Sequence, residues 1–446
     1  MREQDPKKRI KNFDEVNLGY SKEEAVDEAS RCLQCKKPTC VEGCPVSIDI
    51  PGFIKLIKES EQKEALDIIK KTNNLPGVCG RVCPQEKQCE LKCVLQKAKK
   101  PIKIGYLERY ASESKEEDKI PKISKINKKI AIIGSGPAGL TCAADLALLG
   151  YKITVFEALH KAGGVLQYGI PEFRLPKDIV DKEVEFIKKL GVEIKTDYVI
   201  GKIFSIEELL EKYDAIFVSV GAGLPYFLKI PGENLEGVYT ANEFLTRVNL
   251  MKAYKFPQYN TPIKVASKTI VIGGGNVAMD SARVAKRLGS DVTIVYRRSI
   301  EEMPARIEEI EHAKQEGINF LLLTCPTKIL GDNKVSGIEY IQMKLGEPDS
   351  SGRRKPIPIE GSEFTLDCDQ VIIAVGQGPN PLLLKSLNVE KTSKGRIIVD
   401  DKCRTSMKGV FAGGDIASDE TTVIQAMGMG KTAAKGIDEY LKTDSE

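Results

Sequence analysis

Short runs of apolar, mostly β-branched residues recur along the chain from residue 129 onward, and longer stretches of helical spacing separate them. Runs of this kind are typical of buried strands in a parallel sheet whose connections are helices. We therefore predict an α/β fold from residue 130 to the C-terminus. The seven predicted strands lie in 129–134, 152–157, 215–221, 269–274, 292–298, 370–376 and 409–415.

The first 115 residues have a different pattern. Apolar residues in the stretch from Ile54 to Ile69 recur at helical spacing, at Ile54, Ile57, Leu66 and Ile69. The segment from Ser112 to Lys129 is polar and charged, as expected of an exposed linker. We predict a small helical domain that ends in this linker.

Composition and charge exclude few classes of function. The 446 residues are 41% hydrophobic and carry a net charge of +4. No basic stripe with interleaved aromatic residues suggests nucleic acid. The N-terminus is charged and lacks an apolar signal region, and no apolar run reaches the roughly 18 residues of a membrane span. We expect a cytoplasmic protein that binds neither nucleic acid nor membrane.

Cysteine is the residue type whose distribution is most informative. Eight of the twelve cysteines lie between Cys32 and Cys93. In a reducing compartment, clustered cysteines more often bind metal or carry out redox chemistry than form disulfides. The other four stand singly, and we expect them to be small buried side chains. These four are Cys142, Cys325, Cys368 and Cys403.

A glycine-rich turn follows the first predicted strand. It comprises Gly134, Ser135, Gly136, Pro137, Ala138 and Gly139, and a second strand ends at Glu157. Gly134 permits the turn, Gly136 lets the backbone approach a pyrophosphate, and Gly139 lets helix and strand pack closely. The helix N-terminus adds amide donors. With Glu157 as acceptor for the ribose hydroxyls, this predicts a dinucleotide site.

A second turn of this kind follows the strand at 269–272. It comprises Gly273, Gly274, Gly275, Asn276 and Val277. After its next strand the chain has Arg297 and Arg298 in place of an acidic residue. Guanidinium groups suit a 2′-phosphate, which favours NADP(H) over NAD(H). The alternative is that both arginines simply face solvent.

A ribose-type site followed by a 2′-phosphate-type site indicates FAD and then NADPH. This order resembles the flavoproteins with two dinucleotide-binding domains, in which the NAD(P) domain interrupts the FAD domain. The segments 371–379 and 409–416 match that family. The resemblance implies that Asp415 binds the ribityl end of FAD and that a helix from about Thr422 points its N-terminus at the flavin ring. We further expect cofactor contacts at Gly164, Gly221, Gly376 and Gly414.

The disulfide reductases of that superfamily place a cysteine pair against the flavin. No C-x-x-C lies in or beside either turn here, so electrons must leave FAD by another route. The clustered cysteines supply one. Their two runs are Cys32, Cys35, Cys40 and Cys44, and Cys79, Cys83, Cys89 and Cys93. Structural zinc is the rival interpretation. Crowding of ligands within each run and a proline after Cys44 favour two [4Fe-4S] clusters, with Cys44 crossing to the second cluster.

The first run, the segment from Gly77 to Cys93 and the sequence IGYLERY at 104–110 resemble the small subunit of bacterial glutamate synthase and its relatives, including the N-terminal half of dihydropyrimidine dehydrogenase. The resemblance covers essentially the whole chain. It implies one cluster on Cys32, Cys35, Cys40 and Cys93, and a second on Cys44, Cys83, Cys89 and Glu108. Counting cysteines alone would place Cys79 in the second cluster instead of Glu108.

We therefore expect a helical domain with two [4Fe-4S] clusters at 1–125, an FAD-binding domain at 126–245 and 373–446, and an NADP(H)-binding domain at 246–372. The flavin would convert hydride transfer into single-electron steps. Neither His160 nor His312 has a partner pattern, and we expect both at the surface.

Two specific functions fit these features. The first is the electron-input subunit of NADPH-dependent glutamate synthase, whose partner is a larger glutaminase- and FMN-bearing subunit. The second is the large subunit of the bifurcating NADH-dependent reduced ferredoxin:NADP oxidoreductase, whose partners are a ferredoxin-reductase-like flavoprotein subunit and ferredoxin. A non-catalytic scaffold is a third hypothesis, which the intact turns and cysteine runs disfavour.

Overall fold

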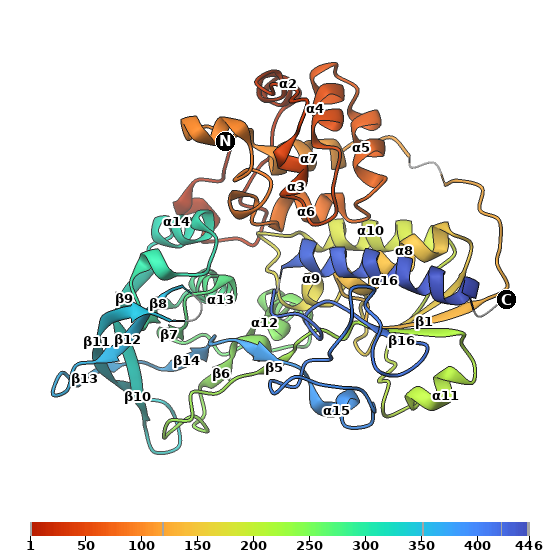
Figure 1. Ribbon diagram of the computed structural model, residues 1–446. Helices are drawn as coiled ribbons and strands as arrows, with labels where there is room; N and C mark the ends of the chain where they lie inside the picture. The colour runs from red at the N-terminus through yellow and green to blue at the C-terminus, as the bar shows by residue number, and fades with distance from the viewer. Residues whose placement is uncertain (1, 118–119, 350–351, 421, 444–446) are drawn as a thin grey trace.

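The computed structural model describes residues 2–117, 120–349, 352–420 and 422–443. Two parallel sheets form the lower part of the molecule, and a helical domain lies above them (Figure 1). All seven predicted strands are present, as β1, β2, β4, β7, β8, β14 and β16. The α/β prediction is confirmed. Within the described residues no helix is both long and apolar enough to cross a membrane.

The N-terminal part is helical, as predicted. The stretch from Ile54 to Ile69 belongs to two helices, separated at Ser60, whose φ is +66°. Its four apolar residues are buried in a core shared with the first dinucleotide domain. The helices are α1 (Pro6–Arg9), α2 (Lys22–Ser30), α3 (Thr39–Glu42), α4 (Ile50–Lys58), α5 (Gln62–Lys70), α6 (Pro76–Val82) and α7 (Ile104–Ser112), with 3-10 turns η1 (Gln85–Lys87) and η2 (Val94–Ala98).

The linker expected from Ser112 to Lys129 has no helix or strand in its described part between α7 and β1. It runs down the outside of the molecule to the first parallel sheet, whose strand order is β16-β4-β1-β2-β3 (Figure 1). The strands are β1 (Lys129–Ile133), β2 (Lys152–Phe156), β3 (Glu193–Lys195), β4 (Ala215–Val218) and β16 (Val410–Ala412).

Helices α8 and α16 pack against each other above this sheet, on the side of the helical domain (Figure 1). Their close approach requires Gly430, because a Cβ there would lie 2.4 Å from the carbonyl oxygen of Ala138. The helices of this part are α8 (Pro137–Leu148), α9 (Val165–Tyr168), α10 (Lys177–Lys189), α11 (Ile206–Leu210), α15 (Pro381–Leu384) and α16 (Val423–Thr443).

The second parallel sheet has the order β6-β14-β7-β8-β9. It comprises β6 (Val238–Thr240), β7 (Lys268–Ile272), β8 (Asp291–Tyr296), β9 (Asn319–Leu322) and β14 (Gln370–Ile373). An antiparallel extension holds β10 (Thr324–Leu330), β11 (Gly337–Pro348), β12 (Arg354–Pro358) and β13 (Phe364–Asp367). The helices are α12 (Ala241–Asn249), α13 (Asn276–Arg287) and α14 (Ile307–Gln315), with 3-10 turns η3 (Ala253–Lys255) and η4 (Ile300–Glu302).

The chain leaves the first sheet after β4 and returns to it at β16, so the second sheet is an insertion in the first domain. The two connections pair with each other as β5 (Leu224–Pro225) and β15 (Gln377–Gly378). The predicted boundaries after residues 245 and 372 fall inside α12 and β14. The domain limits given above stay a prediction.

Candidate dinucleotide and iron–sulfur sites

The first glycine turn connects β1 to α8 in the geometry that a pyrophosphate site needs. Gly134 has φ +99°, and a Cβ there would lie 2.6 Å from the carbonyl oxygen of Ser219. A Cβ on Gly139 would lie 2.0 Å from the carbonyl oxygen of Gly134, so only glycine lets α8 sit this close to the strand. Around Gly136, the N-cap of α8, no atom lies within 4 Å of such a Cβ. The turn therefore leaves an open cradle at a helix N-terminus, which fits a phosphate group.

Glu157 follows β2 and is buried beside this turn. The backbone amide of Ser135 donates to its Oε2 at 3.0 Å, and the amide of Leu159 donates to Oε1 at 2.9 Å. The Ser135 hydroxyl also donates to Oε2. These bonds fix the carboxylate while leaving lone pairs for a ribose. Gly164, with φ +54°, lies against the turn, since its Cβ would be 2.9 Å from the Cα of Gly136.

The loop after β16 brings Asp415 to the same domain. Burial raises the pKa of Asp415 to about 6, although Arg396 opposes the shift. Gly414 before it has φ +77°, and its Cβ would lie 3.1 Å from the Cβ of Ala138 at the start of α8. At the start of α16, the Thr422 hydroxyl accepts from the amide of Gln425 at 3.3 Å. The predicted pyrophosphate and ribityl positions thus adjoin one another, because Gly414 packs against the start of α8.

The other predicted FAD contacts lie at strand ends. Gly221 follows β4 with φ +67°, and no atom lies within 4 Å of where its Cβ would be. Gly376 follows β14 with φ +111°, and the ring of Tyr226 is 3.5 Å from its Cβ position. Both positions adopt backbone conformations that favour glycine, and Gly221 also leaves open space beside the chain.

The second glycine turn repeats the arrangement of the first. Gly273 has φ +146°, and its Cβ would lie 2.3 Å from the carbonyl oxygen of Ala374. Gly274 packs against the ring of Tyr296, 2.7 Å from its Cβ position. Gly275 caps α13, and the nearest atom to its Cβ position is 3.9 Å away. Of the next two residues, Asn276 accepts a hydrogen bond from the amide of Arg306 at 2.9 Å, and Val277 is half-buried.

The two arginines after β8 have different environments. Arg297 is exposed and forms no ion pair with any described residue. Arg298 is 4% exposed, and its guanidinium donates to the carboxylate of Asp349 at 2.5 Å and to the carbonyl oxygen of Arg354 at 2.7 Å. Arg297 is therefore the guanidinium available to a ligand, whereas Arg298 fastens β8 to the β-hairpin of β11 and β12.

The eight clustered cysteines fall into two groups. In the first group, burial raises the pKa of Cys40 to about 11, and the neighbouring thiols of Cys93 and Cys32 add to the shift. Burial also raises the pKa of Cys32, and the neighbouring thiols of Cys35 and Cys93 add to that shift. All four are half-buried and line one pocket that opens to solvent. The remaining lining is mainly apolar.

The second group is more deeply buried. Burial raises the pKa of Cys44 to about 11, and Glu108 and Cys83 add to the shift. Burial also raises the pKa of Cys89, and nearby Glu90 adds to the shift. Smaller contributions in the same direction come from Glu108, Cys83 and Cys44. The chain thus places Cys93 with the first run and Cys44 with the second, which fits the crossed ligand sets implied by the resemblance. The first group offers four sulfurs, and the second offers four sulfurs, Cys79 included, together with the Glu108 carboxylate; both sets suit an iron–sulfur cluster.

Glu108 and Cys79 lie close together in this second group. Burial raises the pKa of Glu108 to about 8, although the Asn73 amide donates to its Oε1 at 2.7 Å. Cys79 is fully buried, and its sulfur lies 3.7 Å from the Asn73 side-chain oxygen and 3.4 Å from the sulfur of Met427. Sequence reasoning missed Asn73, because a single asparagine in a polar stretch gives no pattern.

The second group adjoins the first dinucleotide domain. Met427 belongs to α16, and a Cβ on Gly428 would lie 3.1 Å from the carbonyl oxygen of Pro45, next to Cys44. The same helix begins at the predicted flavin position. The order in space is therefore α16, the second cysteine group, the first cysteine group and solvent.

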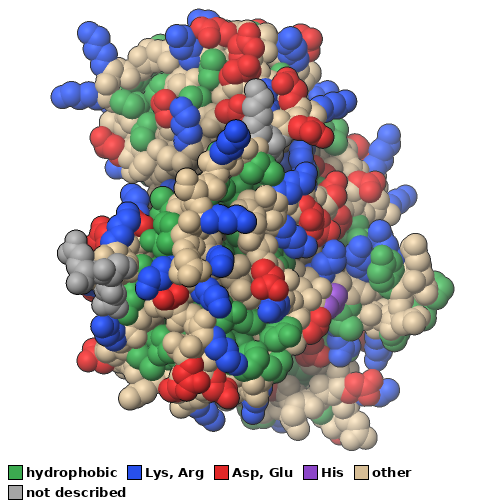
Figure 2. Space-filling model, turned by 90° about the vertical axis from the view of Figure 1, so that its right-hand side faces the viewer, with side chains coloured by type: hydrophobic (Ala, Val, Ile, Leu, Met, Phe, Trp, Pro, Cys, Tyr) green, Lys and Arg blue, Asp and Glu red, His purple; other side chains and the backbone are tan. Residues whose placement is uncertain are grey.

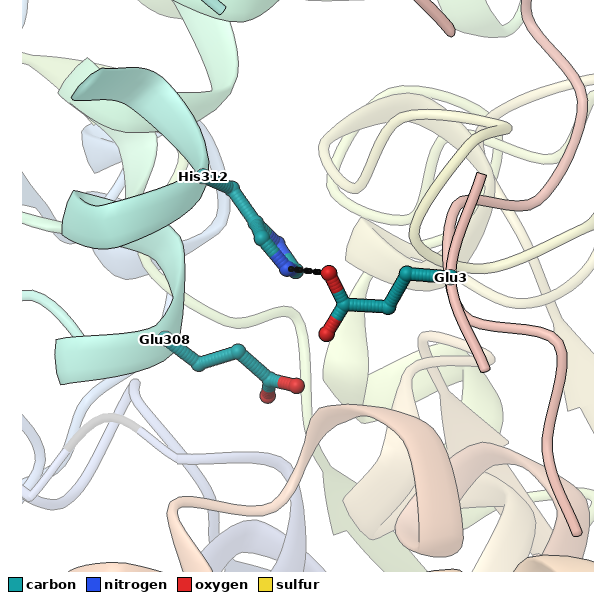
Figure 3. A group of neighbouring side chains, drawn as sticks. All are labelled: Glu3, Glu308 and His312. Atoms are coloured by element: carbon teal, nitrogen blue, oxygen red, sulfur yellow. Dashed lines mark ion pairs between the residues drawn. The ribbon is translucent and has the colours of Figure 1, made fainter. Parts of the chain in front are cut away.

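The structure corrects one prediction and confirms others. His160 is exposed, but His312 is 5% exposed, so its predicted surface position was wrong. Its Nε2 lies 3.2 Å from the carboxylate of Glu3, and Glu308 lies nearby (Figure 3). Of the lone cysteines, Cys325 is half-buried, whereas the other three are buried as predicted.

The N-terminal segment explains the burial of His312. Arg9, with 0% exposure, donates to Glu316 at 2.8 Å, and Tyr106 donates to Glu308 at 2.6 Å. Arg306 lies 3.0 Å from Glu308 as well. Arg9 also lies 3.4 Å from the Glu3 carboxylate. Because cations and a phenol already contact Glu3 and Glu308, we interpret the cluster in Figure 3 as a contact that joins the N-terminus and α7 to α14.

Comparisons with known proteins agree with this geometry. Residues 128–430 match the pyridine nucleotide-disulphide oxidoreductase family, and residues 9–120 match domain II of dihydropyrimidine dehydrogenase, which holds a 4Fe-4S cluster. The glutamate synthase [NADPH] small chain of Halomonas elongata is 36% identical, over 98% of this chain and 96% of that one. The NADPH-Fe(3+) oxidoreductase subunit beta of Geobacter sulfurreducens is 38% identical, over 90% of this chain and 63% of that one.

Among solved structures, FprA, an oxidoreductase of Mycobacterium tuberculosis, matches with a TM-score of 0.60 at 22% identity, over 71% of this chain and 85% of that one. This likeness shows the fold of the two dinucleotide domains. Family, fold and cysteine pattern together show an NADPH-dependent oxidoreductase that uses FAD and has a 4Fe-4S domain. The chain belongs to the pyridine nucleotide-disulphide oxidoreductase family, in the group that contains the glutamate synthase small chains.

Proposed function

We propose that this protein is the electron-input subunit of a larger enzyme of the glutamate synthase type, and that electrons leave it through two [4Fe-4S] clusters. The observation that carries the proposal is the spatial order of the two cysteine groups. One adjoins α16 at Met427, and the other lines a pocket open to solvent. Such an order suits transfer from a buried flavin to a second polypeptide.

We assign the FAD site to the first dinucleotide domain. Backbone amides at Gly136 and the N-terminus of α8 would bind the pyrophosphate, and Glu157 would accept from the ribose hydroxyls. Asp415 would accept from the ribityl chain. The N-terminus of α16 would favour negative charge on the ring. When bound, the flavin supplies the exchange between a two-electron hydride and single electrons.

We assign NADP(H) to the turn at Gly273 to Gly275 and the 2′-phosphate to Arg297. Arg297 is the exposed arginine at the end of β8, and an unpaired guanidinium there can form charge-assisted bonds with a phosphate. Arg298 supports the site indirectly, by holding the hairpin that follows.

We assign the first cluster to Cys32, Cys35, Cys40 and Cys93, and the second to Cys44, Cys83, Cys89 and Glu108. Glu108 is favoured over Cys79 because both Cys44 and Cys89 respond to its charge. Cys79 packs against Met427, and its thiol also contacts that of Cys83, so Cys79 stays the alternative ligand. An oxygen ligand would shift the potential of the second cluster relative to the first. Replacing Glu108 by Ala should lower the iron content, whereas Cys79→Ser should leave it unchanged; the reverse result would reassign the ligand.

We propose a cytoplasmic location, in which the thiols stay reduced; none of the twelve cysteines forms a disulfide. The relatives point to a partner, since they are named as a small chain and as a subunit beta. Affinity purification of the tagged chain from its own cells tests this proposal. A larger glutaminase- and FMN-bearing subunit is the expected partner. A small ferredoxin-reductase-like flavoprotein in its place would refute the glutamate synthase assignment and support the bifurcating enzyme.

A further inference from the structure

Asn73 lies between the two candidates for the fourth ligand of the second cysteine group, Glu108 and Cys79. It is 0% exposed, and its side-chain nitrogen donates to Oε1 of Glu108 at 2.7 Å. Its side-chain oxygen accepts from the Cys79 thiol, whose sulfur lies 3.7 Å away. One buried amide therefore contacts both candidate ligands.

The backbone fixes the orientation of this amide. The N–H of Leu75 donates to the Asn73 side-chain oxygen at 2.8 Å, so a flipped amide would place two donors against each other. The nitrogen therefore faces Glu108. Leu75 is also the N-cap of α6, and its carbonyl oxygen accepts from the backbone amide of Cys79 at 2.9 Å. The same residue thus holds the Asn73 side chain and the backbone of Cys79.

Close packing of α6 on α7 brings Cys79 and Glu108 together. A Cβ on Gly80 would lie 2.6 Å from the backbone nitrogen of Arg109, so this approach needs glycine next to Cys79. The Cys79 thiol also contacts that of Cys83, which we assign as a ligand. Position alone therefore does not exclude Cys79 from the second cluster.

The hydrogen bonds around the two candidates have opposite polarity. Glu108 receives a donor, which favours the carboxylate anion, and this bond to Oε1 leaves Oε2 for iron. Cysteine binds metal as a thiolate, which accepts hydrogen bonds and has none to donate. Asn73 and Met427, however, present acceptors to the Cys79 sulfur, an amide oxygen and a thioether sulfur. These contacts favour Glu108 as the ligand and Cys79 as a bystander.

We propose that Asn73 is a positioning residue that selects Glu108 over Cys79 as the fourth ligand of the second cluster. Partners of metal ligands commonly orient them in this way. Without the Asn73 amide, an iron–sulfur bond to Cys79 replaces the iron–oxygen bond to Glu108, and the thiol proton passes to the released carboxylate. This inference rests on the proposed two-cluster function.

The test measures the iron content and low-temperature EPR spectrum of the anaerobically purified, dithionite-reduced holoenzyme and its variants. Asn73→Leu keeps a branched side chain and removes both hydrogen bonds. It should retain about eight iron atoms, because Cys79 takes over, while the EPR signal and midpoint potential of the second cluster shift. Cys79→Ser should retain about eight iron atoms and the wild-type signal. The two substitutions together should leave about four iron atoms, a loss that neither shows alone.

The matched control is Asn74→Leu. Asn74 is also buried, and its side-chain nitrogen donates to a carboxylate, Oδ1 of Asp145 in α8, at 2.7 Å. The control loses the same kind of bond and should keep the wild-type iron content and EPR signal. If Asn73→Leu does not fold, Asn73→Asp takes its place in every comparison. Aspartate keeps an acceptor for the N–H of Leu75 and replaces the donor beside Glu108 with an oxygen.

Several results would overturn the selection by Asn73. These are a wild-type EPR signal in the Asn73 variant, an equal change in the Asn74 control, or about eight iron atoms in the double variant. Loss of about four iron atoms from the Asn73 variant with Cys79 intact would also overturn it, because the amide would then only stabilise the cluster.

Failure of the proposed function would look different. Zinc without iron in the wild type would remove the clusters altogether. Loss of about four iron atoms from Cys79→Ser, with none lost from Glu108→Ala, would show that the ligand assignment itself is wrong.

Discussion

Replacement of Arg297 by Ala should convert the enzyme from an NADPH-preferring to a nonselective oxidoreductase. The Arg297 side chain is exposed at the end of β8, and no described acidic residue pairs with it. Removing this side chain deletes one charged contact with NADPH. It should leave the binding of NADH unchanged, because NADH lacks the 2′-phosphate.

The magnitude follows from the type of bond. A hydrogen bond to a charged group contributes about 1.5–3 kcal/mol. Since about 1.4 kcal/mol corresponds to a factor of ten, kcat/KM for NADPH should fall about 10- to 100-fold. The kcat/KM for NADH should stay within about twofold of the wild-type value. An equal fall for both nucleotides would instead indicate that the substitution damages the site as a whole.

Arg298→Ala is the matched comparison. Its guanidinium is buried against Asp349 and the carbonyl oxygen of Arg354, so its loss leaves buried groups unpaired and should cost about 1–3 kcal/mol of stability. Steady-state kinetics with both nucleotides and thermal unfolding of each variant provide the test. An Arg297→Ala enzyme that keeps its preference, or a wild type that uses both nucleotides equally, would refute the assignment.

Three further predictions concern packing, buried charge and flavin binding. Gly139→Ala should lower stability by about 1–3 kcal/mol and reduce FAD content, because its Cβ would lie 2.0 Å from the carbonyl oxygen of Gly134; unchanged melting would contradict this. Burial opposes ionisation of Glu316, but the arginines around it hold its pKa at about 2, below the unfolded value of 4.5. Its contribution is therefore present above pH 4.5 and lost as pH falls toward 2; Glu316→Gln should cost about 3–5 kcal/mol and weaken this acid dependence. Glu311→Gln, on the exposed side of α14, should cost less than about 1 kcal/mol of stability. Equal losses of stability in the Glu316 and Glu311 variants would show that the arginines around Glu316 contribute nothing special. Asp415→Asn should weaken FAD binding about tenfold, and wild-type binding should strengthen as pH rises through about 6, because the ionised carboxylate is a stronger acceptor for the ribityl hydroxyls than the protonated acid or an amide; a flat pH profile would argue against it.

The parts of this structure that could be predicted from sequence are those set by neighbouring residues. Each predicted strand is a short apolar run whose side chains are buried on both faces, and each glycine turn needs backbone angles or clearances that only glycine allows. These requirements are local, so the order of residues reveals them.

The environments that the sequence did not reveal depend on contacts across long stretches of chain. His312 is buried because Glu3, which precedes it by about three hundred residues, packs against it. Arg298 is held by Asp349, and the two identical neighbours at 297 and 298 therefore differ in exposure. A motif identifies both arginines, but only the fold shows which one is free.

The surface charge shows the same limitation. On the face in Figure 2, side chains of both signs are intermingled, as the modest net charge suggests. The concentration of lysines around the first cysteine group arises because residues 31–44 and 87–103 come together in the folded chain. A whole-chain net charge averages this asymmetry away.

The most direct test of the central claim is the iron, zinc and FAD content of the anaerobically purified chain, together with that of Cys93→Ser. The account predicts about eight iron atoms and one FAD in the wild type, and about four iron atoms in the variant with its flavin retained. Zinc in place of iron would contradict the account, because no electron could then pass from the flavin to a partner through these cysteines.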